Sequence, residues 1–342
     1  MASSDFSAIS SLFTNGVRQP RDFFSSVGPT LSELSFGLLG SSFEPERDVV
    51  DLAGKVVFVT GGNAGLGKET ILQLAKHRPS RIYLGARTES KARDAIASIQ
   101  EQLPSPADIR YIPLDLASFK SIRVAADEFA ADCDRLDILV LNAGTMGNPP
   151  TVTDEGYEIQ FGTNHVGHFL LTKLLLPTLQ KTVASASPAD VRVVTVSSVG
   201  HNAAPSFEEM TSTDTLLESS TWTRYGASKA ANILFAAELA RRCPEILSVS
   251  IHPGAVSSNL YDHAKASSPA MEYGLTCISL FLRSVRTGAM NQIFAAGAKR
   301  ELLVNGAYYV PVGTRSEHNR YADDADMGRR LWEWTEAEIE KS

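Results

Sequence analysis

The segment most informative about architecture is Thr60-Gly61-Gly62-Asn63-Ala64-Gly65-Leu66-Gly67. It follows a β-branched and aromatic run at 56–59, which predicts a buried strand. It precedes residues 68–77, where apolar side chains recur at helical spacing. A strand, a glycine turn and a helix in this order favour a dinucleotide-binding fold, because the turn lets the backbone approach a pyrophosphate at a helix N-terminus. Taken alone, the pattern also fits a strand–turn–helix unit that binds nothing.

Strands and helices alternate from residue 55 to the end of the chain. The strands are predicted at 56–59, 81–85, 109–114, 137–141, 191–196, 247–251 and 307–310. This alternation is typical of a parallel sheet with helices on both faces. We therefore expect an α/β fold: a Rossmann-type doubly wound parallel sheet of about seven strands, forming a single catalytic domain over 51–342. One long helix is expected at 162–179, starting near residue 154. Residues 1–50 form an N-terminal arm that packs on the surface or contributes a flap, a subunit contact or a membrane-surface contact.

Bulk composition limits the class of protein. The 342 residues carry a net charge of −7, which argues against a nucleic-acid-binding surface. The three cysteines, Cys133, Cys243 and Cys277, lie far apart without metal-ligand spacing, so we expect no metal site and a reducing, cytoplasmic environment. The apolar run 275–282 is too short to span a bilayer as a helix, so no transmembrane segment is expected.

The end of the second predicted strand indicates which nucleotide binds. It reads Gly85-Ala86-Arg87, and an acidic residue at this place would bind the ribose 2′-hydroxyl of NAD. Ala86 supplies no carboxylate to repel a 2′-phosphate, and Arg87 supplies a planar set of donors suited to it. The sequence therefore favours NADP(H) over NAD(H). Lys91 and Arg110 remain as alternative cations, because Arg87 taken alone is also compatible with a solvated charge.

The most specific chemical pattern combines Ser198, Tyr225 and Lys229. Tyr225 and Lys229 are four positions apart, which places them on one face of the helix predicted at 223–242. A free phenol titrates near pKa ~10, and a nearby ammonium lowers that value. Such a tyrosine exchanges a proton with a carbonyl or alcohol oxygen near neutral pH. Ser198, just after the fifth predicted strand, is placed to hold the same oxygen by a hydrogen bond.

At this point the chain resembles the short-chain dehydrogenase/reductase family. The resemblance covers roughly residues 52–315 and rests on family motifs in the family's order: 60–67, Asp115, Asn142-Ala143-Gly144, Asn164, Ser197-Ser198, Tyr225 with Lys229, and Pro253-Gly254. The stretch 161–172 is similar to the retinol-dehydrogenase and protochlorophyllide-reductase-like branch. The stretches 51–55 and 67–70 are similar to fungal members of that branch.

The resemblance implies a role for each matching residue. Ser198 would polarise the substrate oxygen, Tyr225 would transfer the proton, Lys229 would bind the nicotinamide ribose and lower the pKa of the tyrosine, and Asn164 would anchor a water that relays protons to the lysine. Asp115 is expected either to accept from the adenine amino group or to stabilise a turn. The cofactor-binding residues expected from motif and resemblance together are Gly61, Asn63, Gly65, Leu66, Gly67, Arg87, Asp115, Leu116, Asn142, Ala143, Gly144, Tyr225, Lys229, Pro253, Gly254 and Val256.

The substrate loops are expected at 145–153, 200–222 and 255–285. They carry the apolar residues Met146, Phe207, Met210, Trp222, Leu260, Tyr261, Met271, Tyr273, Leu275 and Phe281, which indicate a hydrophobic pocket, although about half could equally pack the core or a lid. His201 is expected on the surface of its loop, with contact to the substrate as the alternative.

The expected reaction interconverts a carbonyl and a secondary or primary alcohol on a hydrophobic small molecule, with NADP(H) as hydride carrier. Resemblance to fungal members permits a secondary metabolite as substrate. The alternatives are double-bond reduction, a redox-neutral isomerisation or cyclisation, and a non-catalytic NADPH-binding sensor. The family often pairs through two long helices, here near 118–132 and 154–179, so a homodimer is one expected assembly.

Overall fold

One mixed sheet forms the centre of the molecule. The computed structural model describes residues 43–185, 190–254, 256 and 284–341. The sheet has eight strands in the order β3-β2-β1-β4-β5-β6-β7-β8. Their bounds are β1 Val56–Thr60, β2 Arg81–Ala86, β3 Ile109–Pro113, β4 Ile138–Leu141, β5 Arg192–Val196, β6 Leu247–Ile251, β7 Tyr308–Val310 and β8 Thr314–Arg315.

All neighbouring strands pair in parallel except β7 and β8, which pair antiparallel. The doubly wound parallel sheet is therefore confirmed, with one strand more than predicted. The extra strand β8 has two residues, both polar and exposed, so it carries no periodic signal.

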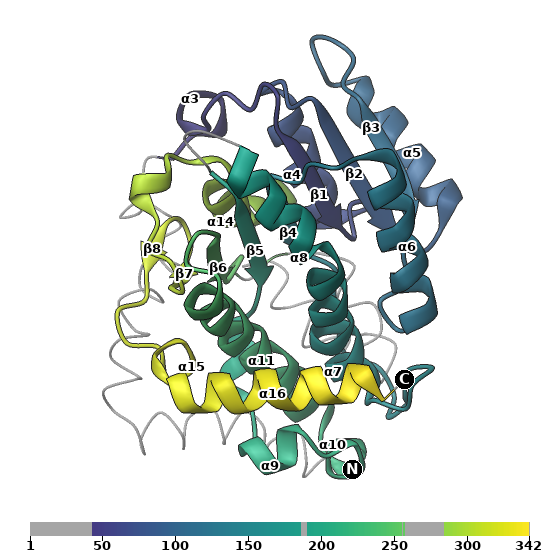
Figure 1. Cartoon of the computed structure of the whole chain (residues 1–342), viewed down its shortest axis with the longest axis vertical. Helices are drawn as coiled ribbons and strands as arrows, with labels where there is room; N and C mark the ends of the chain where they lie inside the picture. Colours follow the sequence, from purple (N-terminus) through teal and green to yellow (C-terminus); the bar gives the residue numbers. More distant parts are fainter. Residues whose placement is uncertain (1–42, 186–189, 255, 257–283, 342) are drawn as a thin grey trace.

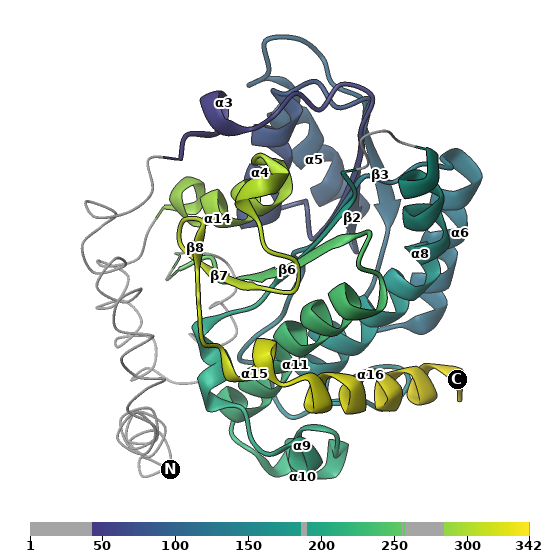
Figure 2. The same cartoon turned by 60° about the vertical axis from the view of Figure 1, so that its left-hand side comes forward.

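Helices cover both faces of this sheet, as Figures 1 and 2 show. A first apolar cluster lies under α4 (Gly65–Ala75), α5 (Glu89–Gln100) and α14 (Val285–Gly297). A second cluster lies under α6 (Phe119–Asp132), α8 (Gly167–Ser185) and α11 (Thr221–Arg242). Strand β1 is buried along its whole length and pairs with β2 and β4, as its continuous apolar run predicts. Short helices complete the described chain: α3 Pro45–Asp48, α7 Ile159–Phe161, η1 Gly162–Val166, η2 Val199–Ala203, α9 Phe207–Met210, α10 Thr213–Glu218, η4 Arg300–Leu302 and α15 Arg320–Asp323.

The single long helix expected from residue 154 to 179 is wrong in detail. The segment begins with one turn of α-helix at α7, continues as the five-residue π-helix η1, and only then becomes α8. Close packing explains why glycines border the π-helix. A Cβ on Gly162 would lie 2.4 Å from Thr153 Cγ2, and one on Gly167 would lie 2.2 Å from the carbonyl oxygen of Leu116. A π-helix is rare in proteins overall, and those that occur are often found at functional sites.

The segment between Ser198 and Tyr225, expected as a substrate loop, folds into the short helices η2, α9 and α10, and its residues Phe207 and Met210 do not line the cavity. Met210 is buried in the cluster on the α11 side of the sheet, and Phe207 packs against that cluster. The guanidinium carbon of Arg330 lies 4.0 Å from the centre of the Phe207 ring. Hydrophobicity alone did not distinguish core from pocket at these two positions.

The last helix, α16 (Ala325–Glu340), lies across α11 in both ribbon views (Figures 1 and 2). Trp332 stacks on Phe235 with an interplanar angle of 7° and meets Phe169 edge-on at 4.8 Å. Lys173 of α8 also pairs with Glu336 at 2.5 Å. The helix therefore covers part of the surface expected to form a dimer, and homodimerisation stays a prediction. Among the described helices, none has the length and hydropathy needed to cross a bilayer.

The N-terminal arm and the third substrate loop fall largely outside the described residues. This applies to residues 1–42 and 257–283, and so to Leu260, Tyr261, Met271, Tyr273, Leu275 and Phe281. Where the arm is described, it packs on α14: Phe43 meets Phe294 edge-on at 5.4 Å, and the amide of Val50 donates to the carbonyl of Gly297 at 2.8 Å.

Candidate active site

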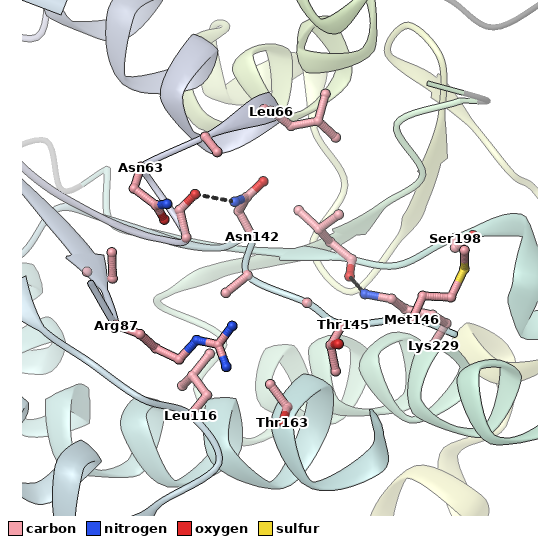
Figure 3. A pocket seen from close by; sticks show the side chains of 18 of the residues that line it. Asn63, Leu66, Arg87, Leu116, Asn142, Thr145, Met146, Thr163, Ser198 and Lys229 are labelled. Carbon is pink, nitrogen blue, oxygen red and sulfur yellow. Dashed lines mark hydrogen bonds between the residues drawn. The ribbon is translucent and has the colours of Figure 1, made fainter. Parts of the chain in front are cut away.

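A cavity of 430 Å³ lies where the carboxyl ends of the parallel strands meet. This is the place where open α/β sheets bind ligands. Figure 3 shows Asn63 and Arg87 towards one end of this cavity, and Ser198 and Lys229 towards the other. The cavity is lined by Gly61, Asn63, Ala64, Gly65, Leu66, Gly85, Ala86, Arg87, Leu114, Asp115, Leu116, Ala117, Asn142, Ala143, Gly144, Thr145, Met146, Asn148, Ile159, Thr163, Val196, Ser197, Ser198, Tyr225, Lys229, Pro253, Gly254 and Val256.

The lining includes nearly all of the catalytic and cofactor-binding residues expected from the sequence. Gly67 and Asn164 are the two exceptions, and both lie behind the wall. Gly67 supports the turn, because a Cβ there would lie 2.4 Å from the carbonyl oxygen of Gly61. Asn148, Ile159 and Thr163 also line the cavity, from elements that follow β4, and no motif in the sequence points to them.

The glycine turn after β1 is built to receive an anion. Gly61 and Gly65 have φ values of 66° and 52°, which favour glycine. Helix α4 starts at Gly65, and its N-cap residue Ala64 provides no side-chain hydrogen bond. The first amide groups of the helix, together with its dipole, are therefore available to a phosphate group. These features fit a dinucleotide pyrophosphate.

Asn142 ties the glycine turn to the end of β4. Its Nδ2 donates to the carbonyl of Thr60 at 2.8 Å, which is the bond across the sheet that the sequence predicts. Gly61 also lies close to Ala143, the residue after Asn142. A Cβ on Gly61 would be 3.0 Å from Cα of Ala143. The small residues after β4 thus let two strand ends approach each other at the floor of the cavity.

Arg87 lies directly after β2 with an exposed side chain. Figure 3 shows its guanidinium group beside Leu116 in the cavity. Within the described part of the chain, no ion pair or hydrogen bond holds it. Arg110, by contrast, pairs with Asp108 at 3.1 Å and with Asp132 at 2.6 Å. Arg87 is therefore the lining arginine that remains available for an anionic ligand.

Asp115 has the turn function that the sequence left open. Its Oδ1 accepts from the amide of Ala117 at 3.0 Å, and its own amide donates to Ser121 Oγ at 2.9 Å. It also lines the cavity, so the turn holds this carboxylate at the wall.

Ser198, Tyr225 and Lys229 meet at one end of the cavity. A Cβ on Gly200 would lie 2.9 Å from the Tyr225 ring and 3.5 Å from Ser198 Oγ, so both side chains border Gly200. Lys229 Nζ lies 5.6 Å from the centre of the Tyr225 ring. Ser198 Oγ accepts from the amide of Gly200 at 3.1 Å, a bond that uses a lone pair and leaves the hydroxyl hydrogen for donation.

Lys229 is buried at the base of this group, 4% exposed. Its ammonium donates to the carbonyl of Val196 at 3.0 Å, one of the dashed lines in Figure 3. Burial lowers the pKa of Lys229 to about 7. The amine therefore gives up its proton near neutral pH far more readily than a surface lysine does.

Asn164 connects the loop after β4 to helix α11. Its Oδ1 accepts from the amide of Thr145 at 2.8 Å, and its Nδ2 donates to the carbonyl of Thr145 and to Ser228 Oγ, both at 3.0 Å. A Cβ on Gly144 would lie 3.3 Å from Asn164 Oδ1 and 3.5 Å from Lys229 Nζ, so the amide and the ammonium are neighbours.

His201 is buried, and its expected position on the surface is wrong. Its Nδ1 lies 2.7 Å from the carbonyl oxygen of Ser198, and its ring packs against Tyr308 and Tyr321. Burial lowers its pKa to about 4, so it stays neutral at physiological pH. Because it bonds the backbone of Ser198, it supports this residue from behind.

A buried ion pair also supports the site, and sequence reasoning missed it. Arg224 Nη1 donates to Glu158 Oε1 at 3.0 Å, and Arg224 Nη2 donates to the carbonyl of Asn148 at 2.9 Å. The other carboxylate oxygen of Glu158 accepts from the amides of Gln160 and Phe161. The pair joins the loop after β4, the start of α7 and the helix that carries Tyr225. No short motif in the sequence signals it.

Fold and cavity together define a Rossmann-type protein that binds a dinucleotide. A family model described as short chain dehydrogenase matches residues 55–208. A short-chain dehydrogenase/reductase of Armillaria gallica is 37% identical over 296 residues, covering 85% of this chain and 92% of its own. Human retinol dehydrogenase 12 is 36% identical over 299 residues, covering 84% of this chain and 86% of its own. The chain belongs to the short-chain dehydrogenase/reductase family.

Solved structures agree with this membership. The complex of Pseudomonas aeruginosa RhlG with NADP has a TM-score of 0.59 and 27% identity, over 77% of this chain and 96% of that one. An uncharacterized protein from Mycobacterium paratuberculosis has a TM-score of 0.65 and 28% identity, over 88% and 98% of the two chains. The protein is thus an oxidoreductase of a family that binds a nicotinamide cofactor. Among the described side chains, no group of three or more His, Cys, Asp or Glu is arranged to hold a metal ion.

Proposed function

We propose that this protein is an NADP(H)-dependent carbonyl reductase, or alcohol dehydrogenase in the reverse direction, acting on a hydrophobic small molecule. One observation carries the proposal. Ser198, Tyr225 and Lys229 lie together at one end of a cavity whose opposite end presents Asn63 and Arg87 (Figure 3). The chemistry that a bound nicotinamide supplies is a hydride, given to the carbonyl carbon.

The chain supplies the proton and the positioning. Tyr225 transfers its hydroxyl proton to the carbonyl oxygen, and the hydroxyl of Ser198 donates a hydrogen bond to the same oxygen. The ammonium of Lys229 stabilises the phenolate that Tyr225 becomes. Asn164 holds the loop that borders Lys229, through its three hydrogen bonds to Thr145 and Ser228.

Residues of the glycine turn and of the strand ends are proposed to hold the cofactor. The uncapped start of α4 receives the pyrophosphate, and Arg87 receives the 2′-phosphate of NADP(H). The P. aeruginosa relative that forms a complex with NADP supports this choice over NAD(H). The nicotinamide half is proposed to contact five further lining residues: Ala143, Gly144, Pro253, Gly254 and Val256.

The substrate is proposed to be apolar where it meets Met146. This residue lines the cavity, and in Figure 3 its side chain extends towards Ser198. The similar fungal and human proteins include a retinol dehydrogenase, whose name specifies a hydrophobic alcohol. A hydrophobic ketone, aldehyde or alcohol, including a fungal secondary metabolite, fits this wall.

The test is NADPH oxidation against a panel of hydrophobic ketones and aldehydes, with Tyr225→Phe as the blank. We expect at least one member to be reduced, and Tyr225→Phe to lower kcat roughly 10²–10⁴-fold while NADPH still binds. Product mass separates reduction from isomerisation, and infrared or NMR detection of the carbonyl separates the two kinds of reduction. Carbonyl reduction gives an alcohol with two added hydrogens, a reduced double bond keeps the carbonyl, and isomerisation adds none. Tight NADPH binding without turnover of any panel member would favour a sensor.

A further inference from the structure

His168 is a buried histidine in the first turn of α8 to which the proposed reaction gives no role. It is 1% exposed. Its Nε2 lies 2.9 Å from Thr60 Oγ1, at the end of β1, and its Nδ1 lies 3.0 Å from the carbonyl oxygen of Asn164, in the π-helix. The imidazole therefore connects strand β1, which precedes the glycine turn, with the π-helix η1, which carries Asn164.

The neighbours of Thr60 determine which ring nitrogen carries the hydrogen. Thr60 Oγ1 accepts from the backbone amides of Asn142 and Ala143, both at 3.0 Å. Those two bonds use its lone pairs, so the hydroxyl must donate its one hydrogen. His168 Nε2 is the near acceptor at 2.9 Å, whereas the carbonyl of Val140 is 3.5 Å away. His168 Nδ1 then carries the hydrogen and donates it to Asn164.

The ring is held in the neutral form. Burial, with a smaller contribution from the nearby cation of Lys229, lowers the pKa of His168 to about 4. The hydrogen-bond direction along the bridge is thus fixed at neutral pH, near the pKa of Lys229.

The backbone and the side chain of Asn164 bind different neighbours. Its backbone carbonyl oxygen accepts from His168. Its side-chain amide bonds the backbone N–H and carbonyl of Thr145 and the hydroxyl of Ser228. Ser228 directly precedes Lys229, and Thr145 lies on the cavity wall. A shift of the Asn164 backbone would therefore move both the loop after β4 and the surroundings of the lysine.

We propose that His168 is a positioning residue. It donates from Nδ1 to the backbone carbonyl of Asn164 and accepts from Thr60. These two bonds hold the π-helix η1 at the distance from the strand ends that Lys229 and Tyr225 need for proton transfer. This inference rests on the proposed function for its kinetic consequence, but not for its structural one.

A matched pair of variants separates the two bonds. His168→Asn places an amide donor close to the position of Nδ1 and keeps the bond to Asn164. His168→Gln places its amide near the position of Nε2 and keeps only the bond to Thr60. We expect His168→Gln to lose roughly 10–100-fold in kcat, as displaced catalytic groups do, with a smaller change in the KM for NADPH. His168→Asn should retain more of the rate than His168→Gln does.

His165→Gln is the control for loss of a buried histidine in the same segment. His165 bonds Thr335 on α16 at 3.0 Å, away from the strand ends. We expect this variant to lower stability but to leave kcat and its pH profile unchanged, whereas His168→Gln shifts that profile. Equal kcat and pH profiles in His168→Gln and wild type, or a larger kinetic effect in His168→Asn than in His168→Gln, would overturn the proposal.

Two readouts do not need turnover. In ¹⁵N-histidine NMR spectra, the signals lost in His168→Gln should be those of a neutral ring protonated at Nδ1. Amide hydrogen exchange in residues 142–145 should accelerate in His168→Gln and not in His165→Gln. If both hold while the wild type reduces no carbonyl, the proposed function fails and the positioning role stands. A ring protonated at Nε2, or unchanged exchange, overturns the positioning role whatever the activity.

Discussion

Lys229 is the buried cation beside Tyr225, and its replacement by methionine gives a quantitative test of the site. Burial lowers its pKa from 10.5 to about 7. In the unfolded chain the lysine keeps its proton until the pH approaches 10.5. In the folded chain the lysine loses that proton near pH 7. Between them the unfolded state binds more protons, so the free energy of unfolding rises with pH.

The size of the effect follows from the two pKa values. The lysine destabilises the folded state by about 4 kcal/mol at pH 7 and about 2 kcal/mol at pH 9. Lys229→Met removes this titration while keeping a long apolar side chain. We therefore expect the stability gained by Lys229→Met over the wild type to shrink by about 2 kcal/mol from pH 7 to pH 9.

Urea unfolding without cofactor, followed by circular dichroism at several pH values in this range, measures the difference. Other titrating groups largely cancel because the two proteins differ at one position. Loss of the bond to the Val196 carbonyl is a constant offset that leaves the slope alone. Equal pH slopes in the two proteins would refute the reasoning, and they would mean that Lys229 keeps an ordinary pKa in the folded state.

Three further changes have defined outcomes. Arg87→Ala should raise the KM for NADPH roughly 10–100-fold, because it removes one or two charged hydrogen bonds to the 2′-phosphate, and should raise the KM for NADH less. Lys91→Ala is the control. A larger rise in the KM for NADPH in Lys91→Ala would assign the phosphate to Lys91 instead. Glu158→Gln leaves the buried Arg224 without its counter-ion and should lower the free energy of unfolding by about 3–5 kcal/mol in denaturant unfolding. The control Asp134→Asn breaks the exposed pair with Lys181 and should leave the free energy of unfolding nearly unchanged. Burial lowers the pKa of His165 to about 3, so the folded state resists protonation and the free energy of unfolding falls as the pH drops below 6.5. His165→Gln should reduce that fall by about 1.4 kcal/mol per pH unit in thermal or urea unfolding at pH 4–6. The same dependence of the free energy of unfolding on pH in variant and wild type would contradict the burial argument.

The parts of the molecule with local periodic signals were predictable from the sequence. Strands β1 and β4 are short apolar runs followed by turn residues, and they lie where predicted. The glycine turn and the Tyr225–Lys229 spacing are also local, and the structure places both at the same cavity. The roles given to these residues stay predictions until the variants are measured.

The parts that depend on distant contacts were not predictable. No residue pattern in 162–166 distinguishes a π-helix from an α-helix, so the wider hydrogen-bond pattern of η1 was not predictable. His201 sits in a polar stretch, and its burial depends on Tyr308 and Tyr321, about a hundred positions later in the chain. The ion pair of Glu158 and Arg224 joins two segments that no spacing rule connects.

The π-helix makes the number of residues in this segment as important as their identity. Each residue of an α-helix turns the chain by about 100°. Deleting any one residue of Gly162–Val166 would let the segment close into ordinary α-helix, and would rotate everything before it by about that angle relative to α8. The Glu158 carboxylate would then swing away from Arg224. A chimera that exchanges substrate loops between relatives therefore has to place its junctions outside residues 158–168, or it will lose the site through register alone.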